Sequence, residues 1–235
     1  MAQIKLYQFS PLSGQESASP FCVKVHYALR YKKLDFEVKN IGTPIEARKL
    51  NPAGKLPVLT YDGVTTTDST DIISFLESRH REPLLYPTDR TLRSRALMLE
   101  DWADESLYWH VVYERWLVKE QFDPFAAILL AGMPRPLRPF IKSFAYRQTR
   151  RQLIGQGLGR LTLEKQREKL SQALGWLDDV LDGGFLCGPD LTIADIGVAA
   201  QVAALTIALT PFAAGEVSKR NNLTRWLGRV RQTVG

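Results

Sequence analysis

Every strand-like segment of this chain lies within its first 67 residues, so the fold must join one small sheet to a larger helical part. Residues 4–9 read IKLYQF, an apolar and aromatic run that predicts a short buried strand. Ser19 and Pro20 predict the start of a helix reaching about Tyr31, because serine favours the N-cap and proline is tolerated at the first helical position. Residues 36–38 predict a second strand. The chain therefore opens with a strand, a helix and a parallel strand.

A second group of strands follows a turn at residues 51–55, which read NPAGK. LPVLTY (56–61) and VTTT (64–67) are joined by Asp-Gly, a dipeptide typical of the tight turn in an antiparallel hairpin. Residues 68–81 then predict a helix with a wide apolar face against the sheet. The order is βαβ, a variable segment, then ββα, which is the thioredoxin arrangement. We therefore predict a thioredoxin-like domain over residues 1–82.

The remainder of the chain, after a proline-containing linker, predicts an all-helical domain over residues 91–235. Helical periodicity covers residues 91–119, and prolines interrupt the pattern around residues 134–139. Thr192 and Asp195 form a capping box, which predicts a buried helix that runs to about residue 209. The predicted fold class is α/β followed by an all-α helical bundle.

Composition excludes several classes of protein. A hydrophobic content of 45% with 24% charged residues is typical of a globular chain. Two cysteines cannot form a disulfide framework, and the three histidines have no partners at ligand spacing, so we expect no metal. The first residues do not resemble a secretion signal, and no run is long enough to span a bilayer. These features predict a cytoplasmic protein.

The formal net charge of +6 is concentrated in residues 135–151 and 219–231. Neither stretch has the spacing of a nucleic-acid-binding motif. We interpret them as solvated helix faces that attract small anions, and we predict neither a nucleic-acid nor a membrane partner.

Ser19 stands at the start of the first helix, where a redox protein of this fold would carry the first cysteine of a Cys-Pro-aromatic-Cys motif. The free N–H groups and positive potential of a helix start stabilise a thiolate. Serine cannot form a disulfide, so the site predicts stabilisation of a thiolate that a ligand supplies. The alternatives are that Ser19 only caps the helix, and that Cys22 is a buried apolar residue and no nucleophile.

Two further pieces fit a peptide ligand. Leu56-Pro57 precedes a strand at the position where thioredoxin-like proteins place a cis proline, which leaves the preceding backbone groups free to pair with a peptide. Asp68 and Ser69 open the next helix and fit a group that carries both an α-amino and an α-carboxylate function, such as the γ-glutamyl end of glutathione. A trans proline at a sheet edge and a plain helix cap are the alternatives.

In combination, four motifs resemble the glutathione transferase superfamily across nearly the whole chain. They are SPFC (19–22), NPAGKLPVL (51–59), DSTDIISFLE (68–77) and DLTIADI (190–196). The segment DESLYWHVVYERW (104–116), together with SPFC, also resembles the failed-axon-connections and metaxin-like branch, some members of which have no known transferase activity.

The resemblance implies a homodimer that uses glutathione as co-substrate. The resemblance implies that Ser19 acts on the glutathione thiol and that Leu56 and Pro57 bind the cysteinyl part. It also implies that Asp68 and Ser69 bind the γ-glutamyl part and that Lys55 binds the glycyl carboxylate. The alternatives to Ser19 as the group that acts on the thiol are Tyr7, Ser10, Ser13 and Cys22.

The aromatic residues of 102–116 predict either helical core or a site for a hydrophobic electrophile. The candidates are Tyr108, Trp109, Tyr113 and Trp116. We therefore expect a detoxifying glutathione transferase that conjugates glutathione to a hydrophobic electrophile, with a peroxidase side activity. The alternatives are a non-catalytic glutathione-binding module and a thiol transferase that depends on Cys22.

Overall fold

A computed structural model describes residues 2–235 and confirms the predicted fold class. Its strands are β1 (Ile4–Gln8), β2 (Glu37–Asn40), β3 (Val58–Tyr61) and β4 (Val64–Thr67), in the order β2-β1-β3-β4. β1 pairs parallel with β2 and antiparallel with β3, and β3 pairs antiparallel with β4. This is the mixed sheet that the turn and strand patterns predict.

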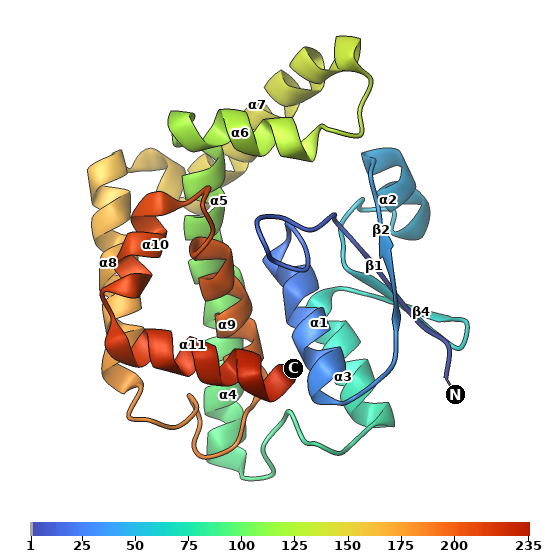
Figure 1. The fold of residues 1–235 in the computed structure, drawn as a ribbon, viewed down its shortest axis with the longest axis vertical. Helices are drawn as coiled ribbons and strands as arrows, with labels where there is room; N and C mark the ends of the chain where they lie inside the picture. The colour runs from blue at the N-terminus through green and yellow to red at the C-terminus, as the bar shows by residue number, and fades with distance from the viewer. Residues whose placement is uncertain (1) are drawn as a thin grey trace.

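Helices α1 (Pro20–Tyr31) and α3 (Ser69–Arg79) lie between the sheet and the helical part of the chain (Figure 1). One face of α1 packs on the sheet through Val25 and Leu29, which share a buried cluster with Leu6 of β1. The opposite face packs against helix α9 (Ile193–Leu205). The segment that the sequence leaves variable contains a short helix, α2 (Pro44–Leu50).

The rest of the chain is helical within the described residues. The remaining elements are α4 (Arg90–Trp102), the π-helical turn η1 (Ala103–Leu107), α5 (Tyr108–Trp116), α6 (Lys119–Leu129), the short η2 (Arg135–Leu137), α7 (Arg138–Gln156), the short η3 (Leu158–Arg160), α8 (Leu163–Val180), α10 (Pro211–Ser218) and α11 (Asn221–Val234). None of the helices described is both long enough and apolar enough to cross a membrane.

Helix α9 forms the centre of the helical part, and every one of its residues is buried. The predicted capping box is present, because Asp195 accepts a hydrogen bond from the Thr192 N–H at 3.0 Å. The same carboxylate accepts hydrogen bonds from the Leu186 N–H at 2.8 Å and from Trp226 Nε1 at 2.9 Å. Asp195 therefore joins the start of α9 to the preceding loop and to α11. The helix ends at residue 205, earlier than the predicted 209.

Helices α4 and α5 are joined without a loop through η1, so residues 90–116 form one long helix with a π turn in its middle. Helices α6 and α7 then form a hairpin at one end of the molecule (Figure 1). Prolines 134, 136 and 139 lie at the turn of this hairpin and in the first residues of α7, where a missing N–H costs little.

Candidate functional site

A cavity of about 530 Å³ lies where the loop before β3, the start of α3 and the α4–η1 segment meet α1. It brings together five of the residues that the sequence predicts. These are Lys55, Leu56, Pro57, Asp68 and Ser69. Phe21, in the first turn of α1, lines the same cavity.

The wall made by the loop before β3 presents free backbone groups. The Leu56–Pro57 peptide bond is cis, as predicted. Neither the N–H nor the carbonyl of Leu56 forms a hydrogen bond within residues 2–235. Asn51 holds the loop in place, because its side chain donates to the Lys55 carbonyl at 3.0 Å and accepts from the Ala53 N–H at 3.0 Å. A peptide can therefore pair with Leu56 as a short strand would.

The start of α3 supplies a second polar wall. Asp68 caps this helix, since its Oδ1 accepts from the Thr70 N–H at 2.9 Å, and its backbone has the strained values φ 71 and ψ 135. Non-glycine residues adopt such angles where the surrounding structure holds them, often at functional sites. Ser69 is buried and lines the cavity, and its hydroxyl forms no hydrogen bond within residues 2–235. A helix start with an unused hydroxyl fits a carboxylate.

Sequence reasoning missed a third wall, which is acidic. Glu100 and Asp101 of α4 and Asp104 and Glu105 of η1 all line the cavity. The spacing of these four residues, i, i+1, i+4 and i+5, places them on one side of a helix, and that pattern in the sequence was the signal available. A π turn at this point agrees with the frequent occurrence of such turns at functional sites.

A buried lysine forms ion pairs with two residues of the acidic wall. Lys24 of α1 is fully buried and forms ion pairs with Glu100 and, at 2.6 Å, with Asp104. It also donates to the Thr70 hydroxyl at 3.1 Å. Burial raises the pKa of Asp104, and the attraction of Lys24 offsets part of that rise. Lys24 thus links α1 to α3, α4 and η1. Because one lysine supplies one positive charge against four carboxylates, the wall keeps a net negative charge.

Ser19 is the N-cap residue of α1, and it is half-buried but does not line the cavity. Its backbone carbonyl accepts from the Cys22 and Val23 N–H groups at 3.1 Å. Burial raises the pKa of the Cys22 thiol to about 11, and hydrogen bonds with Phe9, Ser17 and Ser19 offset only part of that rise. Cys22 is completely buried, which fits its interpretation as an apolar residue.

Tyr7, Ser10 and Ser13, which the sequence also allows as thiol partners, lie outside the cavity lining. Tyr7 packs in the cluster around Cys22. Ser10 and Ser13 are both exposed on the loop before α1. Ser19 is therefore the nearest of these hydroxyl residues in sequence to Phe21, the part of α1 that reaches the cavity.

The aromatic candidates of the long helix do not line the cavity directly. Tyr108 lies beside Phe21, with ring centroids 4.7 Å apart, and Trp109 packs against Tyr108. Tyr113 is buried in a cluster with Leu153 of α7 and Leu158 of η3, and Trp116 packs against Phe122 and Phe125 of α6. Tyr108 is thus the member of the group that reaches the site through Phe21. Tyr113 packs within the helical part, whereas Trp116 packs in a cluster that also contains Leu12 and Ala18 of the loop before α1.

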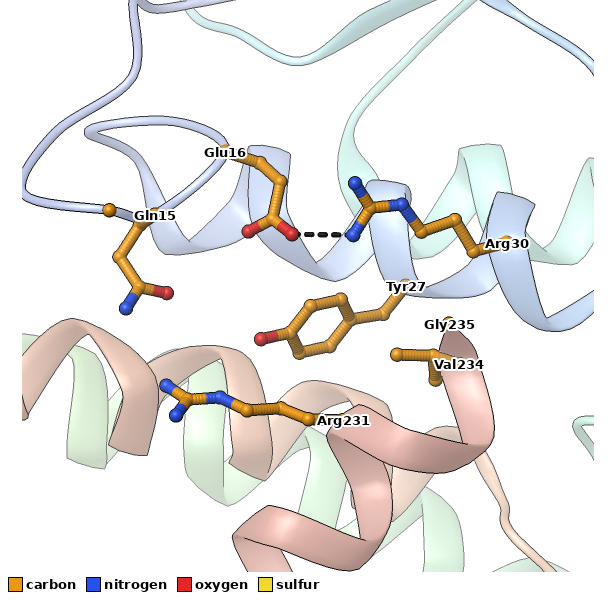
Figure 2. A pocket seen from close by; sticks show the side chains of 8 residues that line it. Gln15, Glu16, Tyr27, Arg30, Arg231, Val234 and Gly235 are labelled. Atoms are coloured by element: carbon orange, nitrogen blue, oxygen red, sulfur yellow. Dashed lines mark hydrogen bonds and ion pairs between the residues drawn. The ribbon is translucent and has the colours of Figure 1, made fainter.

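A smaller cavity of about 330 Å³ lies on another side of α1, between α1 and the end of α11 (Figure 2). Tyr27 and Arg231 line it, and Glu16 pairs there with Arg30 at 2.5 Å. It contains none of the residues that the sequence predicts for the site. Among residues 2–235, no group of three histidine, cysteine or carboxylate side chains is arranged to hold a metal ion.

Comparison with known proteins agrees with the fold described above. The family model of the glutathione S-transferase N-terminal domain matches residues 18–79, and that of the C-terminal domain matches residues 149–229. The isoprene-epoxide–glutathione S-transferase of Rhodococcus sp. strain AD45 is 26% identical over 97% of this chain and 98% of its own length. Human glutathione S-transferase theta-2 is 28% identical over 92% of this chain and 75% of its own.

Solved structures show the same fold. The beta-etherase LigF from Sphingobium sp. strain SYK-6 has a TM-score of 0.67 at 22% identity and covers 98% of both chains. A glutathione S-transferase from Rhodospirillum rubrum F11 has the same TM-score and identity and covers 97% of this chain and 88% of its own. Both domain models match in the expected order, and together they cover more than half of the sequence. The chain therefore belongs to the glutathione transferase superfamily.

Proposed function

We propose that this protein binds glutathione in the cavity of about 530 Å³ and transfers its thiolate to a small apolar electrophile. The observation that carries the proposal is the match between the cavity walls and the tripeptide. Glutathione has a carboxylate at each end, an ammonium group beside one of them, and a peptide backbone between. The cavity offers a helix start, an acidic wall, a free backbone segment and a lysine in one place.

The γ-glutamyl end fits the start of α3. Its carboxylate accepts hydrogen bonds from the Ser69 hydroxyl and backbone N–H, and the positive end of the helix adds to the attraction. The neighbouring ammonium group faces the acidic wall. Asp101 and Glu105 are the exposed carboxylates of that wall, and neither is paired with Lys24. The carboxylate is thus matched with the positive end of the helix, and the ammonium group with the acidic wall.

The cysteinyl and glycyl parts fit the loop before β3. The cysteinyl backbone pairs with the free N–H and carbonyl of Leu56, and the glycyl carboxylate lies near the exposed Lys55. This placement directs the sulfur toward the start of α1, where Phe21 lines the cavity and Ser19 occupies the N-cap position without a capping hydrogen bond from its side chain.

The chemistry requires an ionised sulfur. Lowering the pKa of the thiol by about two units corresponds to roughly 2.7 kcal/mol. A hydroxyl hydrogen bond to a thiolate contributes about 1.5 to 3 kcal/mol, and a helix start about 0.3 to 1 kcal/mol. The thiolate then attacks an electrophilic carbon. A sulfur–carbon bond forms as the bond from carbon to oxygen or halogen breaks, and the leaving atom takes the electron pair.

The similarity to an isoprene-epoxide transferase supports a small epoxide as the first electrophile to test. The aromatic pair of Phe21 and Tyr108 beside the cavity supports an apolar substrate. Cys22 is not assigned a role, because a completely buried thiol with a pKa of about 11 is a poor nucleophile.

Calorimetry with glutathione, followed by turnover assays with a small epoxide and an aromatic halide, tests the proposal. We expect Ser69→Ala to raise the dissociation constant for glutathione about 10-fold or more. We expect Ser19→Ala to lower kcat at least about 10-fold and leave affinity within about two-fold, because its role is in ionisation of the sulfur. Ser13→Ala is the matched control, since Ser13 is an exposed serine of the preceding loop.

The outcomes separate the candidate functions. Absence of binding heat refutes glutathione recognition. Binding without turnover of either electrophile identifies a non-catalytic module, and equal turnover in Ser19→Ala removes Ser19 from the mechanism. A mixed disulfide with glutathione that mass spectrometry detects in the native chain and not in Cys22→Ser would instead indicate the cysteine-dependent thiol transferase.

A further inference from the structure

The α6–α7 hairpin carries an exposed stripe that the proposed function does not use. Phe140, Phe144, Arg147 and Arg151 follow one another at intervals of four, three and four residues along α7, which places them on one face of the helix. Phe140 is 76% exposed and Phe144 is 69% exposed, and both arginines are exposed. The opposite face, which includes Leu153, packs against the helical part.

The stripe carries apolar side chains at one end and cationic side chains at the other. Leu137, in the turn before α7, is 50% exposed, and Ile128 of α6 is 48% exposed, so the apolar end extends over the tip of the hairpin. A soluble helix ordinarily turns such side chains toward the core. Exposed aromatic residues grouped with arginines indicate a surface that binds another molecule or a membrane.

After Asp123 in the first half of α6, the charge of the hairpin is of one sign. No aspartate or glutamate occurs between residues 123 and 164, whereas seven lysines and arginines do. Three of the seven have partners, because Lys142 pairs with Asp123 and because Arg138 and Arg160 donate to backbone carbonyls. Arg147 and Arg151 form no hydrogen bond or ion pair within residues 2–235. Their charge is available to an anionic partner.

We propose that this hairpin docks on the surface of an anionic lipid bilayer, a partner that the sequence alone did not predict. Phe140 and Phe144 insert at the boundary between headgroups and acyl chains, and Arg147 and Arg151 contact lipid phosphates. A basic helix with exposed aromatic residues is the type that lies in a membrane interface. The hairpin stands at one end of the molecule, so a flat surface can approach it (Figure 1).

The charge distribution favours a bilayer over two other occupants. In a symmetric antiparallel pair of chains joined through α7, the arginines of one copy would meet the phenylalanines of the other. Such a pair would remove the arginines from water without supplying a carboxylate, because none occurs between residues 123 and 164. A nucleic acid would use the arginines, but it would leave Leu137 and Ile128 in water at the apolar tip. A bilayer surface accommodates both ends of the stripe.

Sedimentation of the full chain with vesicles tests this proposal independently of glutathione binding. We expect the chain to bind vesicles of phosphatidylcholine with 30% phosphatidylglycerol at least about 10-fold more strongly than pure phosphatidylcholine. Binding should weaken with salt. The variants Phe140→Ser/Phe144→Ser and Arg147→Gln/Arg151→Gln should each reduce partitioning about 10-fold or more. Far-UV circular dichroism and the urea unfolding midpoint of these variants serve as the folding check.

Trp176→Ser and Arg225→Gln are the matched controls. Trp176 is 62% exposed on α8 and Arg225 is exposed on α11, so they change an exposed aromatic residue and an exposed arginine outside the hairpin. Equal binding to both kinds of vesicle overturns the proposal, as does full binding by either hairpin variant. Tighter binding to a single-stranded oligonucleotide, or light scattering that shows a dimer abolished by Phe140→Ser/Phe144→Ser, also overturns it.

Discussion

Replacement of Lys24 by methionine tests how the acidic wall of the cavity is held together. The lysine is completely buried, and its ammonium group contacts Glu100, Asp104 and the Thr70 hydroxyl. Methionine fills a similar volume but supplies no charge and no donor. The substitution therefore leaves Glu100 and Asp104 as two neighbouring carboxylates, one buried and one nearly so, without a cation.

The expected loss of unfolding free energy is about 3 to 5 kcal/mol, the usual result of removing one partner of a buried ion pair. That is a large part of the roughly 5 to 15 kcal/mol that stabilises a folded protein. The loss should depend on pH. Burial already raises the pKa of Asp104, so the folded state binds its proton more readily than the unfolded state does. Without Lys24 this pKa rises further, and the variant should regain stability as the pH falls from 7 toward 5.

Urea unfolding of Lys24→Met at pH 7 and pH 5 measures both effects. Lys165→Met is the matched control, because Lys165 pairs with Glu168 on the surface, where such pairs contribute at most about 1 kcal/mol. The triple variant Lys24→Met/Glu100→Gln/Asp104→Asn removes the unpaired charges and should recover about 2 kcal/mol or more. A loss below about 1 kcal/mol in Lys24→Met, or one that does not shrink at pH 5, refutes this account of the cluster.

Three other predictions concern single groups. Cys22 should resist a thiol reagent at pH 8 until urea unfolds the chain, because burial raises its pKa to about 11; rapid native labelling contradicts this. Asp195→Ala should cost about 3 to 6 kcal/mol in urea unfolding, because three buried N–H donors lose their acceptor, and a loss under 1 kcal/mol would show that water replaces it. Hydrogen bonds with Lys219, Ser171 and Arg220 lower the pKa of Glu216 from 4.5 to about 2. The ionised Glu216 side chain therefore stabilises the fold at neutral pH, and this stabilisation is lost as the pH falls from 4.5 to about 2. Glu216→Gln should flatten the acid limb of the stability curve, and an unchanged limb contradicts the assignment.

Local patterns were sufficient for most of the fold. Asp-Gly between two strands, Ser-Pro at the start of α1 and the capping box before α9 each act over a few residues, so the sequence alone indicates them. Short helix α2 was missed because its seven residues carry little periodic signal. Helix α9 ends at residue 205, before the apolar run ends at residue 209, and Ile207 is the one residue of 206–209 that is buried.

The sequence by itself determined the order of elements and the five cavity residues from Lys55 to Ser69, because turn dipeptides, caps and motif spacing are properties of neighbouring residues. Only the tertiary structure decided which charges meet and which side chains stay exposed. Lys24 and Glu100 are 76 residues apart, and no periodicity in either segment specifies the other as its partner. Leu153 of α7 is buried in a cluster with Tyr113 of α5, whereas Phe144 of α7 is exposed, because burial depends on which helix packs against which face.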